Sequence, residues 1–491
     1  MLWYGLVYFF FFFFISSFFF FFFNKIFFFF NINKNFILKY SIQILLLFYL
    51  FIAFFVYLNL YYIFYLFNEY LIVNQQYLYI FENTIYNYLF NLINLNLILI
   101  NIYYFPFIYI FILVTILSVF FCLTYNFNEL IIFIFYCKLI LLFGYLLFFT
   151  NSLILFFISY EMLLIPSFFI LYKFAKTRRC IEAGYLMFFW TQFGALFLIF
   201  SFLYLFFLTE TSSFNLISNT DFSKFEINFL FICWIIGFGV KLPIWPFYGW
   251  LPKAHVEAST NFSIFLSGVL VKFAFFGLFK CLILIQIEPT FYFVYPFLLI
   301  GIIDAVFKLF YQIDLKKLVA YSTVVEMHWL TICILSGQSV LILANFCMLI
   351  SHALLSSNSF LLVDAINRRF KTRLITEVSG INFLCPKLFI IILINSLVFL
   401  GFPGSIFFLS EVLFFSFFFD LFPLLTLFLI PFLYLLGPTF FFRTWMNVMF
   451  GLSINIYNKI PLDLNSKELI IYGGILFLMF WLGVTWQTFI F

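Results

Sequence analysis

Unbroken apolar runs, long enough to cross a lipid bilayer, recur from one end of this 491-residue chain to the other. A helix needs about 20 apolar residues to span the hydrocarbon core. Membrane-spanning strands would instead alternate apolar and polar residues, whereas runs such as 9–14 are apolar at every position. Only 9% of the residues are charged, against about 25% in an ordinary soluble domain. The sequence therefore predicts an all-α polytopic membrane protein and excludes a soluble enzyme or a disordered chain.

Polar breaks divide the apolar runs into about 14 predicted transmembrane helices. Their approximate bounds are 1–23, 36–67, 97–124, 128–149, 151–173, 182–208, 227–248, 261–286, 288–311, 314–335, 338–363, 388–418, 421–443 and 468–490. The Asn- and Tyr-rich segment 68–96 is expected to be a polar excursion from the membrane. We expect four parts, namely N-terminal helices (1–125), a first repeat (126–286), a second repeat (287–443) and a C-terminal loop with the last helix (444–491).

Lysine and arginine gather in the loops that follow odd-numbered spans, and acidic residues in those that follow even-numbered spans. The basic loops include 173–179 and 368–373, and the acidic loop 209–226 contains Lys224 as a lone exception. This one-sided distribution is the positive-inside pattern, and one missed or invented span in the middle would scramble it. It therefore supports the count of spans and predicts both termini on the side away from the basic loops.

The sequence gives no indication of a metal or redox centre. Its eight Cys lie mostly inside apolar runs and form no C-x-x-C pair, which argues against a disulfide framework, a zinc site or an iron–sulfur cluster. A Gly-rich dinucleotide fingerprint is also absent from the sequence. The net charge of +5 is small and gives no reason to expect nucleic acid as a partner. The 92 Phe are typical of a very AT-rich genome, for which a mitochondrial genome is the expected source.

Ionisable residues inside the apolar runs are the candidate functional groups. Each costs at least ~2.5–3.5 kcal/mol at mid-membrane on insertion scales, so those retained are usually functional or paired. The candidates are Glu161, Lys241, Lys272, Glu326, His328, His352 and Glu411. Lys138 and Lys280 also fall within apolar runs. A lysine near a span end extends its ammonium group to the interface, which favours a structural role for these two.

Two of the candidates lie next to predicted helix breaks. Pro243 and Pro246 follow Lys241, and each removes a backbone donor. The run 401–404, Gly-Phe-Pro-Gly, precedes Glu411 by half a membrane. A helix broken inside a membrane lines a protein-enclosed, hydrated cavity. Because five spans separate the two breaks, the sequence predicts two inverted repeats of five helices, each with a broken helix, as in secondary transporters.

These residue types suit proton transfer. A buried lysine can gain and lose a proton, whereas arginine stays charged, and a nearby glutamate adjusts how tightly the lysine holds it. The alternative is a set of static ion pairs that hold the bundle together. Charges at several depths, two of them beside helix breaks, favour conduction over architecture.

The stretch 241–258 reads Lys-Leu-Pro-Ile-Trp-Pro-Phe-Tyr-Gly-Trp-Leu-Pro-Lys-Ala-His-Val-Glu-Ala. It closely resembles the antiporter-like membrane subunits of respiratory complex I, and the similarity extends through Lys272. The runs 314–322, 351–357 and 402–404 resemble the same family, so the resemblance covers residues 150 to 420. The first 120 residues offer little beyond hydrophobicity.

The resemblance implies a role for each buried residue. Glu161 and Lys241 would form the Glu/Lys pair of the first half-channel, and Lys272 would be the central lysine between the halves. His352 would continue this row along the membrane plane, and Glu411 would be its terminal proton-exchanging residue.

One position departs from the family pattern. Four residues beyond Ser322 the family usually has a His, where this chain has Glu326, and a His appears instead at 328. Two residues correspond to about 200° around a helix, so His328 should point away from Glu326. Glu can still relay a proton, but it cycles between 0 and −1, whereas His cycles between +1 and 0. Its effect on neighbouring lysines is therefore reversed.

The resemblance also implies a setting for the chain. Such a subunit translocates protons in the mitochondrial inner membrane, beside other complex I membrane subunits and neighbouring antiporter-like chains. It holds no cofactor, since NADH, FMN, iron–sulfur clusters and ubiquinone bind other subunits. His255 and Glu257 match the family too, and their expected place is a membrane surface, in a capping or interface role. A subunit of a sodium/proton antiporter and a purely structural scaffold remain the alternatives.

Overall fold

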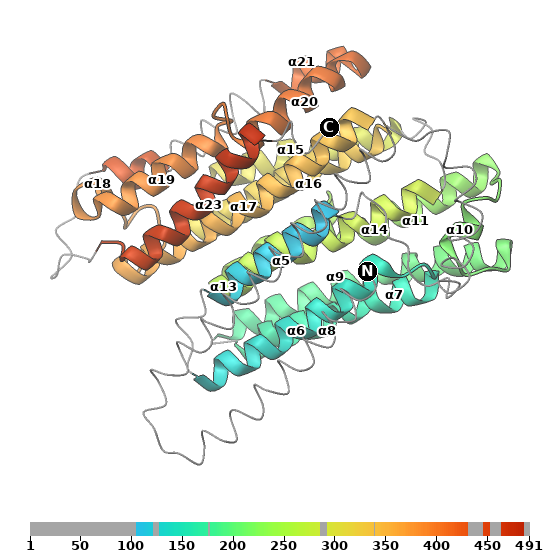
Figure 1. Ribbon diagram of the computed structural model, residues 1–491, viewed down its shortest axis with the longest axis horizontal. Helices are drawn as coiled ribbons and strands as arrows, with labels where there is room; N and C mark the ends of the chain where they lie inside the picture. The colour runs from blue at the N-terminus through green and yellow to red at the C-terminus, as the bar shows by residue number, and fades with distance from the viewer. Residues whose placement is uncertain are drawn as a thin grey trace, which may run out of the picture. The chain divides into compact units, whose positions relative to one another are not determined.

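The computed structural model describes residues 105–120, 127–174, 177–284, 292–337, 339–430, 445–451 and 463–485. Within these ranges the chain consists of helices joined by short connections, with only isolated backbone bridges and no strand. Figure 1 shows most of the long helices running beside one another along a similar direction. The prediction of an all-helical protein is therefore confirmed for the described part of the chain.

The helices of the first half are α5 (Phe105–Phe120), α6 (Phe127–Phe149), α7 (Leu153–Met162), α8 (Leu164–Lys173), α9 (Arg178–Thr209), α10 (Phe214–Ile217), α11 (Lys224–Lys241), η4 (Phe247–Gly249), α12 (Trp250–Glu257), α13 (Thr260–Phe265), η5 (Leu266–Leu270) and α14 (Val271–Leu284). Those of the second half are η6 (Tyr292–Val294), α15 (Tyr295–Phe310), α16 (Leu315–Leu335), α17 (Ser339–Phe370), α18 (Ile381–Leu384), α19 (Pro386–Phe399), α20 (Ile406–Leu421), α21 (Pro423–Ile430) and α23 (Ser466–Thr485).

Seven helical segments among the described residues are long and apolar enough to cross a membrane. They are Ile132–Phe149, Leu153–Lys173, Arg178–Thr209, Thr260–Leu284, Leu315–Leu335, Val340–Phe370 and Ser466–Thr485. A polytopic membrane protein is therefore confirmed. The predicted spans 1–23 and 36–67 and the excursion 68–96 lie outside the described residues, so the count of 14 stays a prediction.

Several predicted spans are interrupted in the structure. The span predicted over 151–173 is divided at Leu163 into α7 and α8. Pro166 accounts for this, because it has no N–H and its ring clashes with the carbonyl of Met162. The span predicted over 388–418 is likewise two helices, α19 and α20, separated by residues 400–405. The second of these begins where the Ser405 hydroxyl accepts the Phe408 N–H, which is a typical N-cap.

Glycines let three helices pack closely around the first break. A Cβ added to Gly194 of α9 would lie 2.7 Å from the carbonyl oxygen of Gly237 in α11. A Cβ added to Gly277 of α14 would lie 2.4 Å from the ring of Phe238 in α11. Small residues at such contacts allow backbones in membrane proteins to approach. The end of α11, which carries Lys241, is therefore held between α9 and α14.

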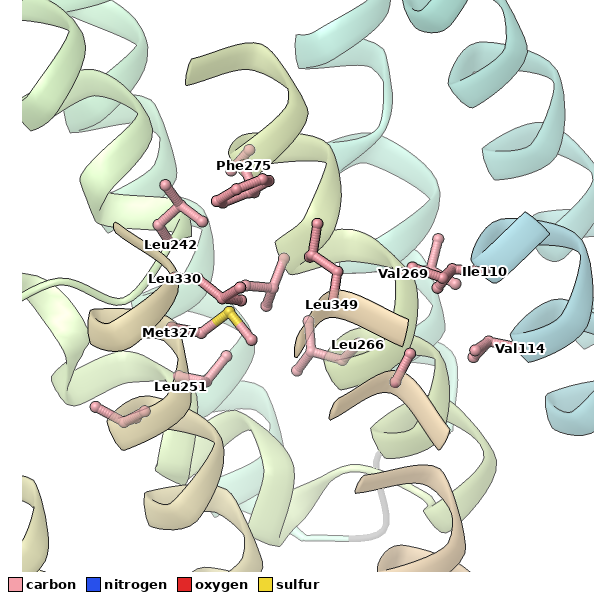
Figure 2. Packing of buried hydrophobic residues seen from close by; sticks show 14 of the residues in the cluster. Ile110, Val114, Leu242, Leu251, Leu266, Val269, Phe275, Met327, Leu330 and Leu349 are labelled. Atoms are coloured by element: carbon pink, nitrogen blue, oxygen red, sulfur yellow. The ribbon is translucent and has the colours of Figure 1, made fainter. Parts of the chain in front are cut away.

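Apolar side chains fill the space between the central helices. Figure 2 shows Met327 and Leu330 of α16 near Leu242 and Leu251, which flank the first break. It also shows Val269 of η5 facing α5. The buried polar residues described below are embedded in this core, where water is scarce and an uncompensated charge is costly.

An ion network fastens the last helix at the end of α17. Arg368 pairs with Asp364 at 2.9 Å and with Glu468 of α23 at 3.1 Å. Glu468 also pairs with Arg369. Asp463 accepts the first backbone N–H groups of α19, those of Lys387 and Leu388, at 2.9 and 3.2 Å. The basic residues Arg368 and Arg369 thus join α17 to α23, and Asp463 holds the start of α19.

Candidate functional site

Glu161 and Lys241 form a buried ion pair. Lys241 Nζ donates to Glu161 Oε1 at 3.0 Å, and the two side chains are only 13% and 17% exposed. Gln192 of α9 donates to the other carboxylate oxygen at 3.0 Å. The Lys241 ammonium also lies 3.6 Å from the centre of the Tyr160 ring, where the electron-rich face of the ring attracts a cation. The predicted partners are therefore brought together, with two further residues around them.

Local sequence explains this placement. Lys241 is the last residue of α11, because Pro243 and Pro246 cannot continue the helix. A cation is favourable at this helix end, where backbone carbonyls lack intrahelical partners. Glu161 lies in the last turn of α7, just before the interruption at Leu163. Two helix ends thus face each other, and each presents one charged side chain.

A cavity of about 40 Å³ adjoins this ion pair. Its lining includes Lys241, Ser167 and Thr191, together with Leu270 and Val271 at the junction of η5 and α14. Although most of its lining is apolar, the cavity has room for water, since one molecule needs roughly 10–15 Å³ by this measure. The space therefore extends from Lys241 toward the helix that carries Lys272.

Lys272 follows a turn of π-helix. η5 is π-helical over residues 266–270, and Lys272 Nζ donates to the carbonyl of Ser267 within that turn. The side chain is 4% exposed. π-Helical turns are rare in proteins, and those that occur are frequently found at functional sites.

Glu326 and His352 form a second buried pair, between α16 and α17. Glu326 Oε2 contacts His352 Nδ1, and the side chains are 9% and 1% exposed. The other ring nitrogen of His352 has no hydrogen-bond partner among the described residues. The residue that departs from the family pattern is therefore paired with His352.

Glu411 lies against the second break. Its Oε2 would be 2.5 Å from a Cβ added to Gly401. Gly401 adopts a φ of +70°, in the left-handed region that favours glycine. Glu411 lies in the first half of α20, and its carboxylate points back along this helix toward the turn. Side chains of a helix tilt toward its N-terminus, which explains this direction.

His328 points away from Glu326, as the helical spacing predicts. Its Nε2 accepts the backbone N–H of Trp245 at 2.9 Å, and its Nδ1 lies 2.8 Å from the carbonyl of Val324. It therefore contacts the first break rather than the Glu326–His352 pair. Sequence analysis identified the direction of this ring but not its partners.

The side chain of His255 does not have the expected capping role. It is fully buried, and its ring stacks on Phe360 of α17 with centroids 4.8 Å apart. Neither ring nitrogen has a hydrogen-bond partner among the described residues, so it caps nothing there. The carbonyls near the end of α12 are instead bound by Lys316 and Arg373. Burial here results from α17 covering the segment, which local sequence does not reveal.

Lys280 also differs from the expected interfacial lysine. It is 6% exposed, and its ammonium group lies 4.6 Å from the ring centre of Phe214 and 5.4 Å from that of Phe156. It donates to the carbonyl of Thr150, at the end of α6. The ammonium does reach a loop at the end of a span, but protein covers it. Lys138 is partly buried on α6.

Gln192 and Tyr160 were missed by sequence analysis. Gln192 was detectable, because it is a polar amide inside an otherwise apolar run. Tyr160 precedes Glu161 directly, but in a chain with 31 Tyr its presence distinguishes nothing. Only the packing of α7 against α11 identifies its ring as a neighbour of Lys241.

Sequence comparisons identify relatives of the chain. The family model described as "NADH:quinone oxidoreductase/Mrp antiporter, TM" matches residues 150–437. The NADH-ubiquinone oxidoreductase chain 4 of Paramecium tetraurelia is 37% identical over 335 residues, which cover 67% of this chain and 70% of the relative. The protein of the same name from Marchantia polymorpha is 33% identical over 343 residues, 69% of each chain. The resemblance predicted from the motifs is thereby confirmed.

Solved structures share the fold. A chain of respiratory complex I from Thermus thermophilus with bound NADH superposes with a TM-score of 0.67 at 21% identity, covering 76% of this chain and 80% of that one. A chain of the Mrp complex from Dietzia sp. gives a TM-score of 0.69 at 13% identity, covering 78% and 81%. Together with the matched family model and the sequence relatives, they show that the chain belongs to the NADH:quinone oxidoreductase/Mrp antiporter family of membrane proteins.

Proposed function

We propose that this chain is a proton-translocating subunit in the membrane arm of respiratory complex I, the NADH:ubiquinone oxidoreductase. The observation that carries the proposal is the buried Glu161–Lys241 pair at a helix break, beside a cavity that can hold water. A proton-exchanging lysine needs a partner that modulates its charge and a hydrated path. The names of the sequence relatives supply the enzyme to which the subunit would belong.

Purification tests the enzyme assignment. Mild detergent extraction through an affinity tag on this chain is expected to bring flavin and iron–sulfur subunits with it. The measurements are the flavin and iron content of the purified material and its NADH:ubiquinone activity. A related sodium/proton antiporter, the alternative to which the Mrp likeness points, would purify without flavin and iron and would exchange sodium for protons. Such material would contradict the proposal.

Each buried residue receives a role in this proposal. Glu161 modulates the charge of Lys241, and Lys272 receives the proton from the water-sized cavity. Glu326 and His352 pass it onward along the row, and Glu411 exchanges it with one surface of the membrane. The order is supported by two buried pairs that each join different helices, Glu161–Lys241 and Glu326–His352.

The order of helices supports two inverted repeats, 126–286 and 287–443. α9 has 32 residues and precedes the four-residue α10 and then α11, which ends at the first break. α17 also has 32 residues and precedes the four-residue α18 and then α19, which ends at the second break. The same series occurs twice, five predicted spans apart, and an odd offset inverts the second copy in the membrane.

We place the chain in the mitochondrial inner membrane as a multi-pass protein of the mitochondrial genome, with both termini toward the intermembrane space. Its partners would be other complex I membrane subunits, especially neighbouring antiporter-like chains, and lipid. It would hold no cofactor, with NADH, FMN, iron–sulfur clusters and ubiquinone bound by other subunits. The basic loops support the orientation, because positively charged loops are retained on the side of synthesis.

Thiol labelling tests the orientation. A Cys at position 178, where Arg178 is 92% exposed, is expected to react with an impermeant reagent in inside-out vesicles but not in intact mitochondria. A Cys at exposed Glu210, at the other end of α9, is expected to show the reverse. Background labelling should be low, since the cysteines that the structure describes are all buried. Labelling of position 178 from outside intact organelles would exclude the orientation.

A further inference from the structure

The backbone N–H groups around the first break can be accounted for one by one. Residues 242–247 contain two prolines, which have no N–H. Leu242 donates to the Phe238 carbonyl, Ile244 to that of Gly239, and Phe247 to that of Ile244. The N–H of Trp245 instead donates to His328 Nε2 at 2.9 Å. A side chain from another helix thus satisfies the one donor that the local backbone leaves over in this segment.

The ring of His328 is fixed in the form that can accept this hydrogen bond. Its Nδ1 lies 2.8 Å from the carbonyl of Val324, and a carbonyl can only accept, so Nδ1 carries the proton. The Nε2 lone pair is then free to accept from Trp245. The tautomer is assigned from these partners. The residue is 0% exposed, and burial makes an unsatisfied N–H in this place costly.

Helix α15 also packs against the ring of His328, at Gly301. A Cβ added to Gly301 of α15 would lie 2.1 Å from His328 Nε2 and 2.8 Å from Trp245 Cβ. The imidazole therefore occupies the space that any other residue at 301 would fill. Three elements meet at this point, namely the break after α11, α15 and α16, and each contributes a residue that fits the other two.

We propose that His328 is a positioning residue of the Lys241 site, because by accepting the Trp245 N–H it fastens the break that follows Lys241 to α16. This rests on the proposed function, since it assigns work to His328 within the same proton path. Two residues before His328, α16 carries Glu326 on its opposite side. Helix α16 therefore contacts both the segment that places Lys241 and His352 of α17. His328 makes the first contact through the Trp245 N–H, and Glu326 makes the second.

The test uses variants of His328 in the assembled complex. His328→Leu removes the acceptor, and the Trp245 amide is expected to exchange its hydrogen about tenfold faster or more, since a buried donor loses its partner. Proton translocation per NADH oxidised should fall in parallel. His328→Gln places an amide oxygen near the Nε2 position and carries no titrating proton, so it should restore both. Ser336→Ala is the control and should change neither, because Ser336 is a buried residue at the end of the same helix and donates to the carbonyl of Cys333, away from His328.

Hydrogen exchange at the Trp245 amide can be measured with nearly single-residue resolution. In the segment 243–246 only Ile244 and Trp245 have an amide hydrogen, because the other two residues are prolines. If His328→Leu does not assemble, Gly301→Ala gives the test, since its Cβ must displace the ring while leaving the histidine in place. It should show the same faster exchange and reduced translocation.

The outcomes separate this inference from the proposed function. Unchanged exchange at Trp245 in assembled His328→Leu or Gly301→Ala would overturn it. So would a His328→Gln complex that protects the Trp245 amide but translocates no better than His328→Leu, since the ring would then act by titrating. Normal translocation by Lys241→Met would overturn the function itself, while exchange at Trp245 would still report whether His328 holds the break.

Discussion

Complex I that contains Lys241→Arg in this chain is expected to assemble and to lose proton translocation by about 100-fold or more, the scale of a lost acid–base group. Arginine would keep the positive charge and could still pair with Glu161, which lies 3.0 Å from the present ammonium. It does not release its proton in proteins. A titrating site therefore fails with a structurally acceptable residue, and coupled ubiquinone reduction should fall with translocation.

Comparison with Lys241→Met distinguishes the two explanations of the ion pair. A static pair would tolerate Arg far better than Met, whereas a proton-exchanging site should tolerate neither. Translocation is measured in reconstituted vesicles, with assembly checked on a native gel. Lys308→Arg is the matched control, because Lys308 also pairs with an acid, Asp304 at 2.8 Å, but lies outside the buried row. Near-normal translocation by assembled Lys241→Arg complex would restore the static ion pair.

Glu326→Gln is expected to slow proton transfer by about 10- to 100-fold while leaving the complex intact. The amide keeps the size of the side chain and can still contact His352 Nδ1, so packing between α16 and α17 should survive. It cannot carry a proton. The proton would therefore be held up between Lys272 and His352.

The rate of proton transfer and the coupled turnover are measured together in this variant. Glu257→Gln serves as the control. It makes the same chemical change at a glutamate that accepts a hydrogen bond from Thr177 at 3.2 Å, away from Glu326 and His352. Wild-type translocation and turnover in Glu326→Gln would make Glu326 a structural acid that only orients His352. The relay in this chain would then have to bypass α16.

Much of the candidate site could be predicted from the sequence, because an ionisable side chain inside the hydrocarbon core is costly unless it has a partner. A lysine and a glutamate buried in different apolar runs must find partners, and Lys241 and Glu161 do so. The separation of Glu326 from His328 follows from helical geometry alone, at about 100° per residue. The break after Lys241 follows from Pro243, since no helix passes a proline without loss.

Other features depend on contacts between distant segments and could not be predicted locally. Gln192 becomes relevant only because α9 lies beside α7, and His255 is buried only because Phe360 of α17 covers it. The interruption at Leu163 was within reach, since Pro166 stands inside the apolar run. Its effect was overlooked because hydropathy measures how long a run is and not whether its backbone is continuous.

The length of α17 has a consequence for how its two ends respond to their surroundings. Its 32 residues correspond to about 48 Å, whereas the hydrocarbon core is about 30 Å thick. The apolar part of the helix ends before Asp364, so the excess falls at the end with Arg368 and Arg369. Dissolved salt can screen the ion network that holds α23 there, but it cannot reach Glu161 and Lys241 as easily. Raising the ionic strength should therefore loosen the last helix long before it disturbs the proton path.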